Sequence, residues 1–219
     1  MIGTLLYAAL GIRPDIAYAV THLSRYNQNP LAEHINYAKY ALKYLVSTKD
    51  LRICYDGSSN AGLIGYSDSD WAEDRDDHHA TSGHVFTMAN AAISWVSRQQ
   101  KTVALSVGEA EYMELSDASR QNAWLRTFLM EIGFEPADAT PLCGDNQSSI
   151  FLAVNCVIEQ QTKHIDVRHH YIWEQLDEKK VELFYIPGED NPADIFTKPL
   201  FTIKIVKFRE ALGLVEYTE

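Results

Sequence analysis

Acidic side chains stand at the ends of several predicted strands and helices, where their chemistry would be that of metal ligands. The stretch GYSDSDWAEDRDD, residues 65–77, continues an apolar lead at residues 63–66, so Asp68 falls at the end of a strand that we expect to be buried. Carboxylates in such a place repel one another and lose hydration, which is costly unless a cation is present. The sequence therefore predicts a cation beside Asp68.

Three further carboxylates come from distant segments. Glu111 lies in the first turn of a long predicted helix, Asp145 lies between a strand and a helix, and Asp194 lies just inside a short helix. Singly, each has an ordinary explanation, because acids favour helix N-termini and strand-end turns. If the sheet gathers all four acids, a divalent metal must offset their repulsion, and hard oxygen ligands select Mg²⁺ or Mn²⁺. Two such ions can activate a water and stabilise a leaving oxygen in phosphodiester cleavage.

Hydrophobic periodicity predicts the elements that must position these acids. Residues 1–50 are predicted to be helical, with Pro14 in a first turn and an amphipathic helix after Pro30. We expect this part to be a helical hairpin. Its second helix carries an apolar stripe made of Leu31, Ile35, Ala38, Leu42 and Leu45.

The pattern changes at Leu51, where short β-favouring segments begin, and Ala89-Asn90 suggests a hairpin turn between two of them. An antiparallel meander followed by βα crossovers predicts a mixed sheet with helices packed on it. The strands are expected at 51–57, 63–68, 84–88, 91–97, 141–144 and 181–187. The helices are expected at 109–133, 146–155, 165–177, from 191 and at 202–213.

Composition limits the classes of function. A net charge of −11 over 219 residues argues against a protein that holds nucleic acid by overall positive charge. Three cysteines without paired spacing fit a reducing compartment and neither a disulfide framework nor a zinc site. No long apolar run or secretion signal is evident, so we expect no membrane association and an intracellular, cytoplasmic location.

Longer motifs carry a resemblance to a known family. They are "GYSDSDWAED", "ATSGHVF", "AISWVSRQQKTVALSVGEAEYMEL", "CGDNQSSIFLAVN", "QTKHIDVRHHYI" and "VELFYIPGEDNPADIFTKPL". In this order they resemble the ribonuclease H domain of copia-type LTR retrotransposon Pol polyproteins. Residues 2–45 resemble the end of the preceding reverse transcriptase, so the chain looks like a C-terminal Pol fragment.

The resemblance implies a fold, a domain division and an activity. The fold is α/β: a ribonuclease H-like mixed five-stranded sheet flanked by helices and preceded by a helical hairpin. Residues 1–50 would be the reverse transcriptase part, 51–200 the ribonuclease H-like domain and 201–219 a C-terminal helical tail. The activity would be endonucleolytic hydrolysis of the RNA strand of RNA–DNA hybrids, and the upstream reverse transcriptase domain would be a partner. If the chain is part of an intact element, the resemblance implies a location in a virus-like particle.

Site residues follow from the resemblance, residue by residue. The catalytic metal ligands would be Asp68 of "YSDSDW", Glu111 of "EAEY", Asp145 of "CGDNQS" and Asp194 of "NPADIFTK". They would hold two Mg²⁺ ions, for which Mn²⁺ can substitute, with Asp68 bridging both. Asp70 and Glu109 are the alternatives to their neighbours Asp68 and Glu111.

Weaker signals surround these acids. Lys163, Arg168 and Lys198 are candidate phosphate contacts, although ordinary surface charge explains them equally well. His164, with His169 and His170, could supply a protonatable group, although helix packing explains these histidines too. Two departures from the family pattern, Val107-Gly108 and Asp76-Asp77, argue for reduced activity, and we expect the first to cost the long helix a hydroxyl cap.

Two other functions remain open at this point. The first is a catalytically inactive ribonuclease H-fold module that serves as a binding or structural part of a decayed or domesticated Pol fragment. The second is another nuclease of the same superfamily, such as an integrase or resolvase, against which the EAEY and NPADIFTK contexts count.

Overall fold

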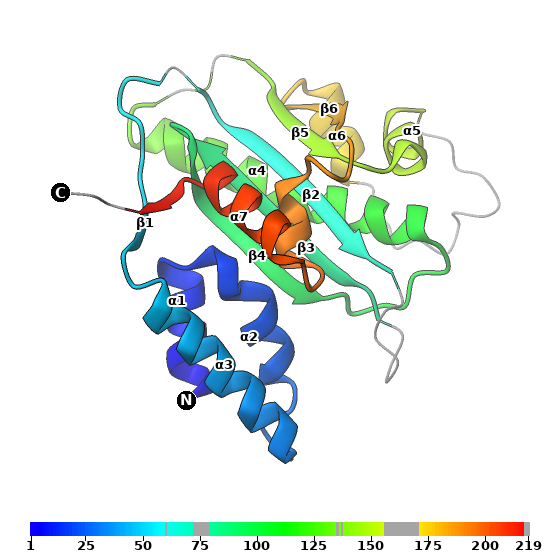
Figure 1. Ribbon diagram of the computed structural model, residues 1–219. Coiled ribbons are helices and arrows are strands. Elements are labelled where there is room, and N and C mark those ends of the chain that lie inside the picture. Colours follow the sequence, from blue (N-terminus) through cyan, green and yellow to red (C-terminus); the bar gives the residue numbers. More distant parts are fainter. Residues whose placement is uncertain (60, 72–78, 135, 137, 156–170, 217–219) are drawn as a thin grey trace.

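A mixed five-stranded sheet forms the centre of the protein. The computed structural model describes the chain except residues 60, 72–78, 135, 137, 156–170 and 217–219 (Figure 1). The strand order is β4-β3-β2-β5-β6, in which β3 runs antiparallel to β2 and β4, while β5 runs parallel to β2 and β6. The strands are β2 (Ile64–Asp70), β3 (Thr81–Met88), β4 (Ala91–Gln99), β5 (Thr140–Gly144) and β6 (Val181–Tyr185). The predicted mixed five-stranded sheet flanked by helices is confirmed.

The β3–β4 hairpin turns where the sequence predicts. Ala89 and Asn90 have φ of 52° and 61°, which a two-residue hairpin of type I′ requires at both positions. On its other side β3 pairs with β2, and Gly83 lies opposite Asp68 in that ladder. A Cβ at Gly83 would come within 2.6 Å of the Phe196 Cβ, so glycine allows a 3₁₀ helix to lie directly on the sheet beside Asp68.

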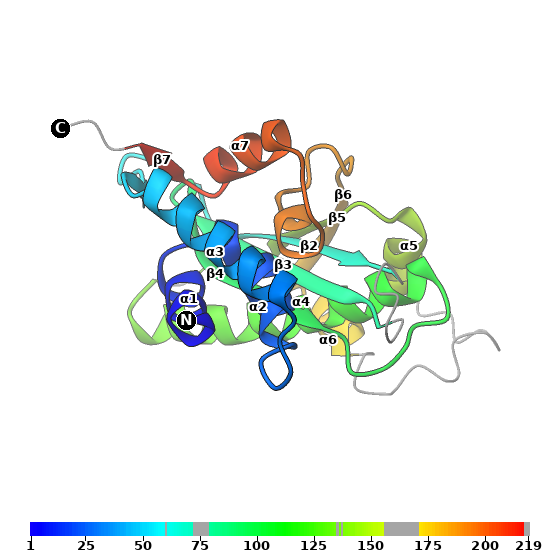
Figure 2. The ribbon, with the colours of Figure 1, turned by 60° about the horizontal axis from the view of Figure 1, so that its bottom comes forward.

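Helices cover the two faces of the sheet (Figure 2). On one face lies the long helix α4 (Val107–Glu131) with α5 (Gln147–Asn155) and α6 (Tyr171–Asp177). The 3₁₀ helix η3 (Pro192–Phe196) and helix α7 (Thr202–Ala211) lie on the other. Neighbouring residues of β3 divide between the two cores, because Phe86 packs in the cluster of Leu115 and Ile172, whereas Val85 packs in that of Phe196 and Phe208.

The N-terminal part is helical, as expected, but contains one more helix than a hairpin. It comprises α1 (Ile2–Gly11), the 3₁₀ turn η1 (Pro14–Ile16), α2 (Ala17–Ser24) and α3 (Ala32–Ser47). Trp95 of β4 donates to the Ala9 carbonyl at 2.8 Å, which ties α1 to the sheet. The stripe predicted on α3 is wrong in part, since Leu31 is 56% and Ile35 41% exposed, while Ala38 and Ala41 are buried.

The C-terminal tail is only partly helical. After α7 the chain forms a strand, β7 (Leu214–Glu216), which pairs antiparallel with β1 (Leu51–Ile53) in a separate two-stranded sheet. The expectation of a helical tail over 201–219 is therefore wrong at residues 214–216, which form a strand, and residues 217–219 lie outside the described residues. Gly213 has φ of 74°, and a Cβ there would lie 2.5 Å from that of Ala91, so glycine ends the helix and lets the tail cross the sheet closely.

Candidate metal centre

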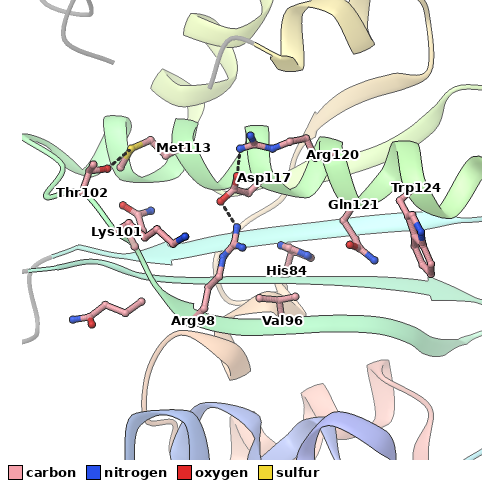
Figure 3. A pocket seen from close by; sticks show the side chains of 12 residues that line it. His84, Val96, Arg98, Lys101, Thr102, Met113, Asp117, Arg120, Gln121 and Trp124 are labelled. Carbon is pink, nitrogen blue, oxygen red and sulfur yellow. Dashed lines mark hydrogen bonds and ion pairs between the residues drawn. The ribbon is translucent and has the colours of Figure 1, made fainter. Parts of the chain in front are cut away.

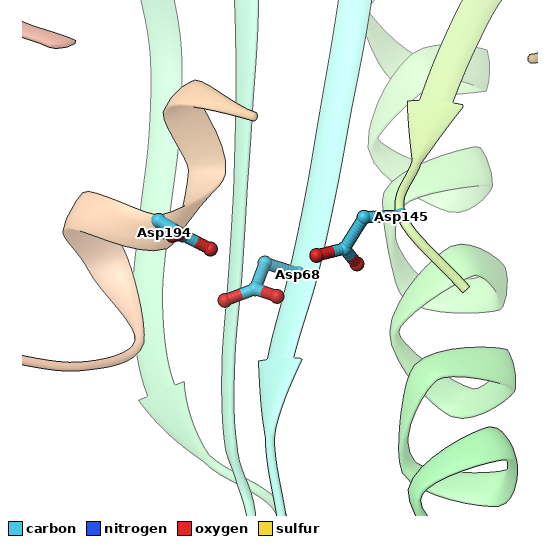
Figure 4. A group of neighbouring side chains, drawn as sticks. All are labelled: Asp68, Asp145 and Asp194. Carbon is cyan, nitrogen blue, oxygen red and sulfur yellow. The ribbon is translucent and has the colours of Figure 1, made fainter. Parts of the chain in front are cut away.

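Three aspartates converge at the carboxyl end of strand β2. Asp68, Asp145 and Asp194 each offer a carboxylate oxygen, and these oxygens lie within 4.8 Å of one another (Figure 4). Asp68 and Asp194 are each 1% exposed, and Asp145 is half-buried. Together with Glu111 we call them the acid cluster.

Sheet register brings Asp68 and Asp145 together. Tyr66 of β2 pairs with Cys143 of the parallel strand β5. Two residues later stand Asp68, within β2, and Asp145, directly after the end of β5. Because parallel strands end at the same edge of a sheet, both carboxylates reach that edge.

Neighbouring asparagines, not the acids, cap the two short helices. Asn146 Oδ1 accepts from the Ser149 amide at 3.0 Å at the start of α5, so the alternative explanation of Asp145 as a helix cap is wrong. Asn191 Oδ1 accepts from the Ala193 amide at 3.1 Å, and Asn191 Nδ2 donates to the Ser67 carbonyl at 2.9 Å. The second bond fixes η3, and with it Asp194, beside strand β2.

Glu111 reaches the aspartates from helix α4, which lies on the face of the sheet opposite η3. It stands in the second turn of α4, since the helix begins at Val107, two residues before the predicted start and four before Glu111. Its Oε1 accepts from the Ser69 amide at 3.2 Å, so Glu111 is held against the end of β2. The expectation that it lies in the first turn is wrong, because the helix is longer.

The alternative acid Glu109 has a structural task. The Ser106 hydroxyl accepts from the Glu109 amide at 3.2 Å, and Glu109 Oε2 accepts from the Leu105 amide at 2.8 Å. The Ser106 hydroxyl is therefore the cap of the helix, and the Glu109 carboxylate binds the amide of the residue before the cap. The expected loss of a hydroxyl cap at Val107-Gly108 is therefore wrong. The other alternative, Asp70, lies opposite Thr81 in the β2–β3 ladder and outside the group of three aspartates.

Burial and like charge raise the pKa values of the acid cluster. Burial raises the pKa of Asp68 to about 7; Lys198 opposes this rise, and the charges of Asp194 and Asp145 add to it. Burial, followed by the charges of Asp68 and Asp145, holds the pKa of Glu111 well above its ordinary value. The pKa of Asp145 is raised as well, first by burial. These carboxylates therefore carry charge at a cost that a cation would remove.

Two lysines and a threonine contact the aspartates. Lys198 Nζ lies 2.7 Å from Asp194 Oδ1 and 3.4 Å from Asp68 Oδ2, and Lys204 Nζ lies 2.9 Å from Asp194 Oδ2. The Thr197 hydroxyl donates to Asp68 Oδ2. Burial lowers the pKa of Lys198, but the charges of Asp68 and Asp194 outweigh burial and raise it.

The sequence analysis missed two of these contacts. Thr197 lay within the motif NPADIFTK, but nothing in the motif indicated its bond to Asp68. Lys204 lies on the next helix and gave no signal. Lys198 was a candidate phosphate contact, and the structure places it among the acids. The other weak candidates, Lys163, His164 and Arg168, lie outside the described residues.

The donor set fits a divalent cation. The carboxylate oxygens of Asp68, Asp145 and Asp194 are hard ligands and lie close enough to share one ion. With Glu111, four carboxylates outnumber the two lysines that contact them. These acids come from four separate segments of the chain, which supports a metal centre over four unrelated helix caps.

A separate cavity of about 550 Å³, the α4–β4 pocket, contains none of these acids (Figure 3). Its walls include Arg98 of β4 and Arg120 of α4, which both pair with Asp117. His84, also in the wall, contacts the fully buried Glu114 through Nδ1 and Oε1 at 2.6 Å.

Among the described residues, no helix has the length and hydrophobicity that a membrane span requires.

Comparisons with known proteins agree with this description. The chain is 40% identical over 213 residues, 97% of its length, to the retrovirus-related Pol polyprotein from transposon TNT 1-94 of Nicotiana tabacum, and it spans 16% of that polyprotein. No protein-family profile matches the chain. The structure of LC11-RNase H1 isolated from compost is 20% identical, with a TM-score of 0.46, and the match covers 63% of this chain and 93% of that one. The foamy viral protease-reverse transcriptase solved with double-stranded DNA is 9% identical, with a TM-score of 0.50 over 84% of this chain and 31% of that one, a likeness of fold alone.

Proposed function

Because the chain belongs to the retrovirus-related Pol polyproteins of transposons, we propose that it is the ribonuclease H of a copia-type element, which hydrolyses the RNA strand of RNA–DNA hybrids during reverse transcription. The observation that carries the proposal is the convergence of Asp68, Asp145 and Asp194 within 4.8 Å, with Glu111 beside them. Two bound Mg²⁺ ions, or Mn²⁺ in their place, would supply an activated water and stabilise the leaving oxygen.

Three residues of the acid cluster would have distinct tasks in this reaction. Asp68, which lies between Asp145 and Asp194, would be a ligand of the bound metal from the end of strand β2 (Figure 4). Glu111, fixed by the Ser69 amide, and Asp194, fixed by lysine, hold their oxygens in place before any substrate arrives. Preorganised ligands of this kind avoid the cost of ordering side chains during the reaction.

The RNA strand would be selected by shape and not by sequence. A hybrid presents 2′-hydroxyls in a wide, shallow groove, and a protein can contact these hydroxyls without reading bases. Lys198, whose side chain is 30% exposed, is a candidate phosphate contact at the rim of the acid cluster. With a net charge of −11, we expect the isolated chain to bind hybrid weakly and to lose affinity as salt rises.

An upstream reverse transcriptase domain would supply the remaining affinity. The N-terminal helices expose apolar side chains that a soluble domain usually covers, with Tyr7 84%, Leu10 67% and Val46 72% exposed. We propose that these helices face the polymerase part of the same polyprotein, in an intracellular setting.

Hydrolysis of a labelled RNA–DNA hybrid tests the function. We expect cleavage of the RNA strand in Mg²⁺, loss of cleavage in EDTA and recovery in Mn²⁺. The variant Asp145→Asn is the matched control for a contaminating nuclease, because its surroundings are retained while one ligand charge is lost. Cleavage that persists in chelator, or in this variant, would contradict the proposal.

A binding module without activity is the second candidate. The observation that favours it is the contact of Asp194 with two lysines, which neutralise part of the acid cluster without metal. Metal-independent hybrid binding without cleavage, measured on the chain joined to its upstream domain, would support this candidate.

A further inference from the structure

The two oxygens of Asp194 are divided between two lysines. Oδ1 lies 2.7 Å from Lys198 Nζ, and Oδ2 lies 2.9 Å from Lys204 Nζ. Lys198 stands four residues after Asp194 in sequence, whereas Lys204 reaches it from α7. The carboxylate therefore has two cationic neighbours, one on each oxygen.

The lysines differ in what else they contact. Lys198 Nζ also lies 3.4 Å from Asp68 Oδ2, so this ammonium stands between two aspartates of the acid cluster. Lys204 Nζ donates instead to the Gly188 carbonyl at 3.4 Å. Gly188 packs closely on Asp145, because a Cβ there would lie 2.7 Å from Asp145 Oδ2. Lys204 thus joins Asp194 to the loop that packs on Asp145.

We propose that Lys198 competes with a divalent cation for the oxygens of Asp68 and Asp194, whereas Lys204 is a positioning residue that holds Asp194 for that cation. The inference rests on the proposed function, since it requires a divalent cation at the acid cluster.

Charge and space explain the competition. A metal ion shared by Asp68 and Asp194 would approach the same oxygens as the Lys198 ammonium, and two cations that close together repel each other. Lys198 must therefore leave when the ion binds, and its side chain, 30% exposed, can extend into water. Lys204 contacts the other oxygen of Asp194, Oδ2, and the Gly188 carbonyl, so it need not move.

Opposite changes in Mn²⁺ affinity would separate the two roles. Isothermal titration of the full chain with Mn²⁺ should show tighter binding for Lys198→Met, about tenfold, which corresponds to one lost competing interaction of about 1.4 kcal/mol. Lys204→Met should bind several-fold more weakly, and Lys204→Arg should recover most of the loss. Lys207→Met is the matched control on the same helix, because Lys207 pairs with Asp190 at 2.5 Å, and it should bind as wild type does.

Folding is measured beside binding. Thermal unfolding in EDTA should show that Lys198→Met is less stable than wild type, since the buried aspartates lose a counter-ion, and that Mn²⁺ stabilises this variant more than wild type. If Lys198→Met does not fold without metal, Lys198→Arg replaces it. Arginine retains the charge and can engage both carboxylates, so this variant should bind Mn²⁺ more weakly than wild type.

The possible results test the competition by Lys198, the positioning by Lys204 and the metal centre separately. Equal or weaker Mn²⁺ binding by Lys198→Met, or stronger binding by Lys198→Arg, overturns the competition. Unchanged binding by Lys204→Met overturns the positioning role. If wild type itself binds no Mn²⁺, the proposed metal centre and this inference both fail, whereas metal binding that is equal in all variants overturns this inference alone.

Discussion

The acid cluster and the Asp117 pairs of the α4–β4 pocket both join carboxylates to basic side chains, but in different surroundings. In the acid cluster the side chains of Asp68 and Asp194 are 2% and 1% exposed. In the pocket, the side chain of Asp117 is 23% exposed, and those of its partners Arg98 and Arg120 are 48% and 37% exposed. Water screens the exposed pairs, so they add little to stability, whereas buried charge loses much of its hydration and must be offset locally.

This difference separates ionised groups that water stabilises from ionised groups whose burial destabilises the folded protein. The exposed pairs of the pocket need no ligand, because solvent already stabilises each charge. The acid cluster instead gathers carboxylates whose pKa values are raised by burial and by one another. Such a site is less stable than an apolar one of the same shape until a cation binds, which is the mark of a functional site.

The largest expected effect is that of Asp68→Asn on cleavage. The change keeps the shape and removes the central ligand charge, so hybrid cleavage should fall about a thousandfold. In EDTA the same variant should be as stable as wild type or more stable by about 1 kcal/mol, because a buried, repelled charge is gone. Its stabilisation by Mg²⁺ should largely disappear. The measurements are hybrid cleavage and thermal unfolding, each with EDTA and with Mg²⁺.

Asp70→Asn is the control for this variant, since Asp70 ends the same strand and lies outside the group of three aspartates. It should retain both cleavage and the Mg²⁺ response. If Asp68→Asn is destabilised in EDTA yet keeps cleavage and the Mg²⁺ response, Asp68 is structural and the assignment is wrong.

The second effect concerns the buried pair in the wall of the pocket. Glu114→Leu removes the partner of His84, which is 2% exposed, and leaves its Nδ1 unpaired. The free energy of unfolding should fall by about 1–3 kcal/mol, and metal should not restore it. Chemical denaturation measures this, with Glu131→Leu at the exposed end of the same helix as control. A Glu114→Leu variant as stable as wild type would contradict the expectation that a buried polar group must be offset by a nearby partner.

The third effect is a pH dependence that belongs to the acid cluster. The pKa of Asp68 is raised from 3.8 to about 7, so the folded state binds this proton more tightly than the unfolded state does. In EDTA, the free energy of unfolding should therefore fall as pH rises from about 4 to about 7, by on the order of 1 kcal/mol or more. Saturating Mg²⁺ should flatten the fall, because the metal replaces the protons. Stability that rises through this window in EDTA would show that the acids are stabilised by their lysines instead.

The sequence predicted the parts of the fold that depend on local patterns. The Ala89-Asn90 turn and the strands on either side follow from residues that lie next to one another. The pairing of β1 with β7 joins residues 51 and 216, and no local pattern indicates such a long-range contact. The stripe on α3 was misplaced for a related reason: periodicity predicts an apolar face, but the neighbouring elements decide which part of it is buried.

The residues of the candidate site likewise fall into those that local motifs indicate and those that depend on long-range packing. The four acids were found through motifs, and the sheet register that joins Asp68 to Asp145 is consistent with a parallel βα crossover. Serine is a favoured N-cap residue, but Ser106 was not recognised as the cap because the helix was expected to begin at Glu109 and begins at Val107. Lys204 could not be found, because its contact with Asp194 depends on how α7 packs against η3.

The smallest effect is expected in the exposed part of the pocket. Asp117→Asn removes the carboxylate that pairs with both Arg98 and Arg120, and the side chain of Asp117 is 23% exposed. Because both arginines remain well hydrated, the free energy of unfolding should fall by no more than about 1 kcal/mol, and added salt should shrink the difference. Hybrid cleavage and Mn²⁺ affinity should be unchanged, since none of these residues contacts the acid cluster in the described part of the chain. Denaturation of wild type and Asp117→Asn at low and high salt measures the effect. A loss of several kcal/mol that salt does not reduce would mean that the pocket is closed to water, and the contrast with the acid cluster would then rest on the excess of carboxylates and not on burial.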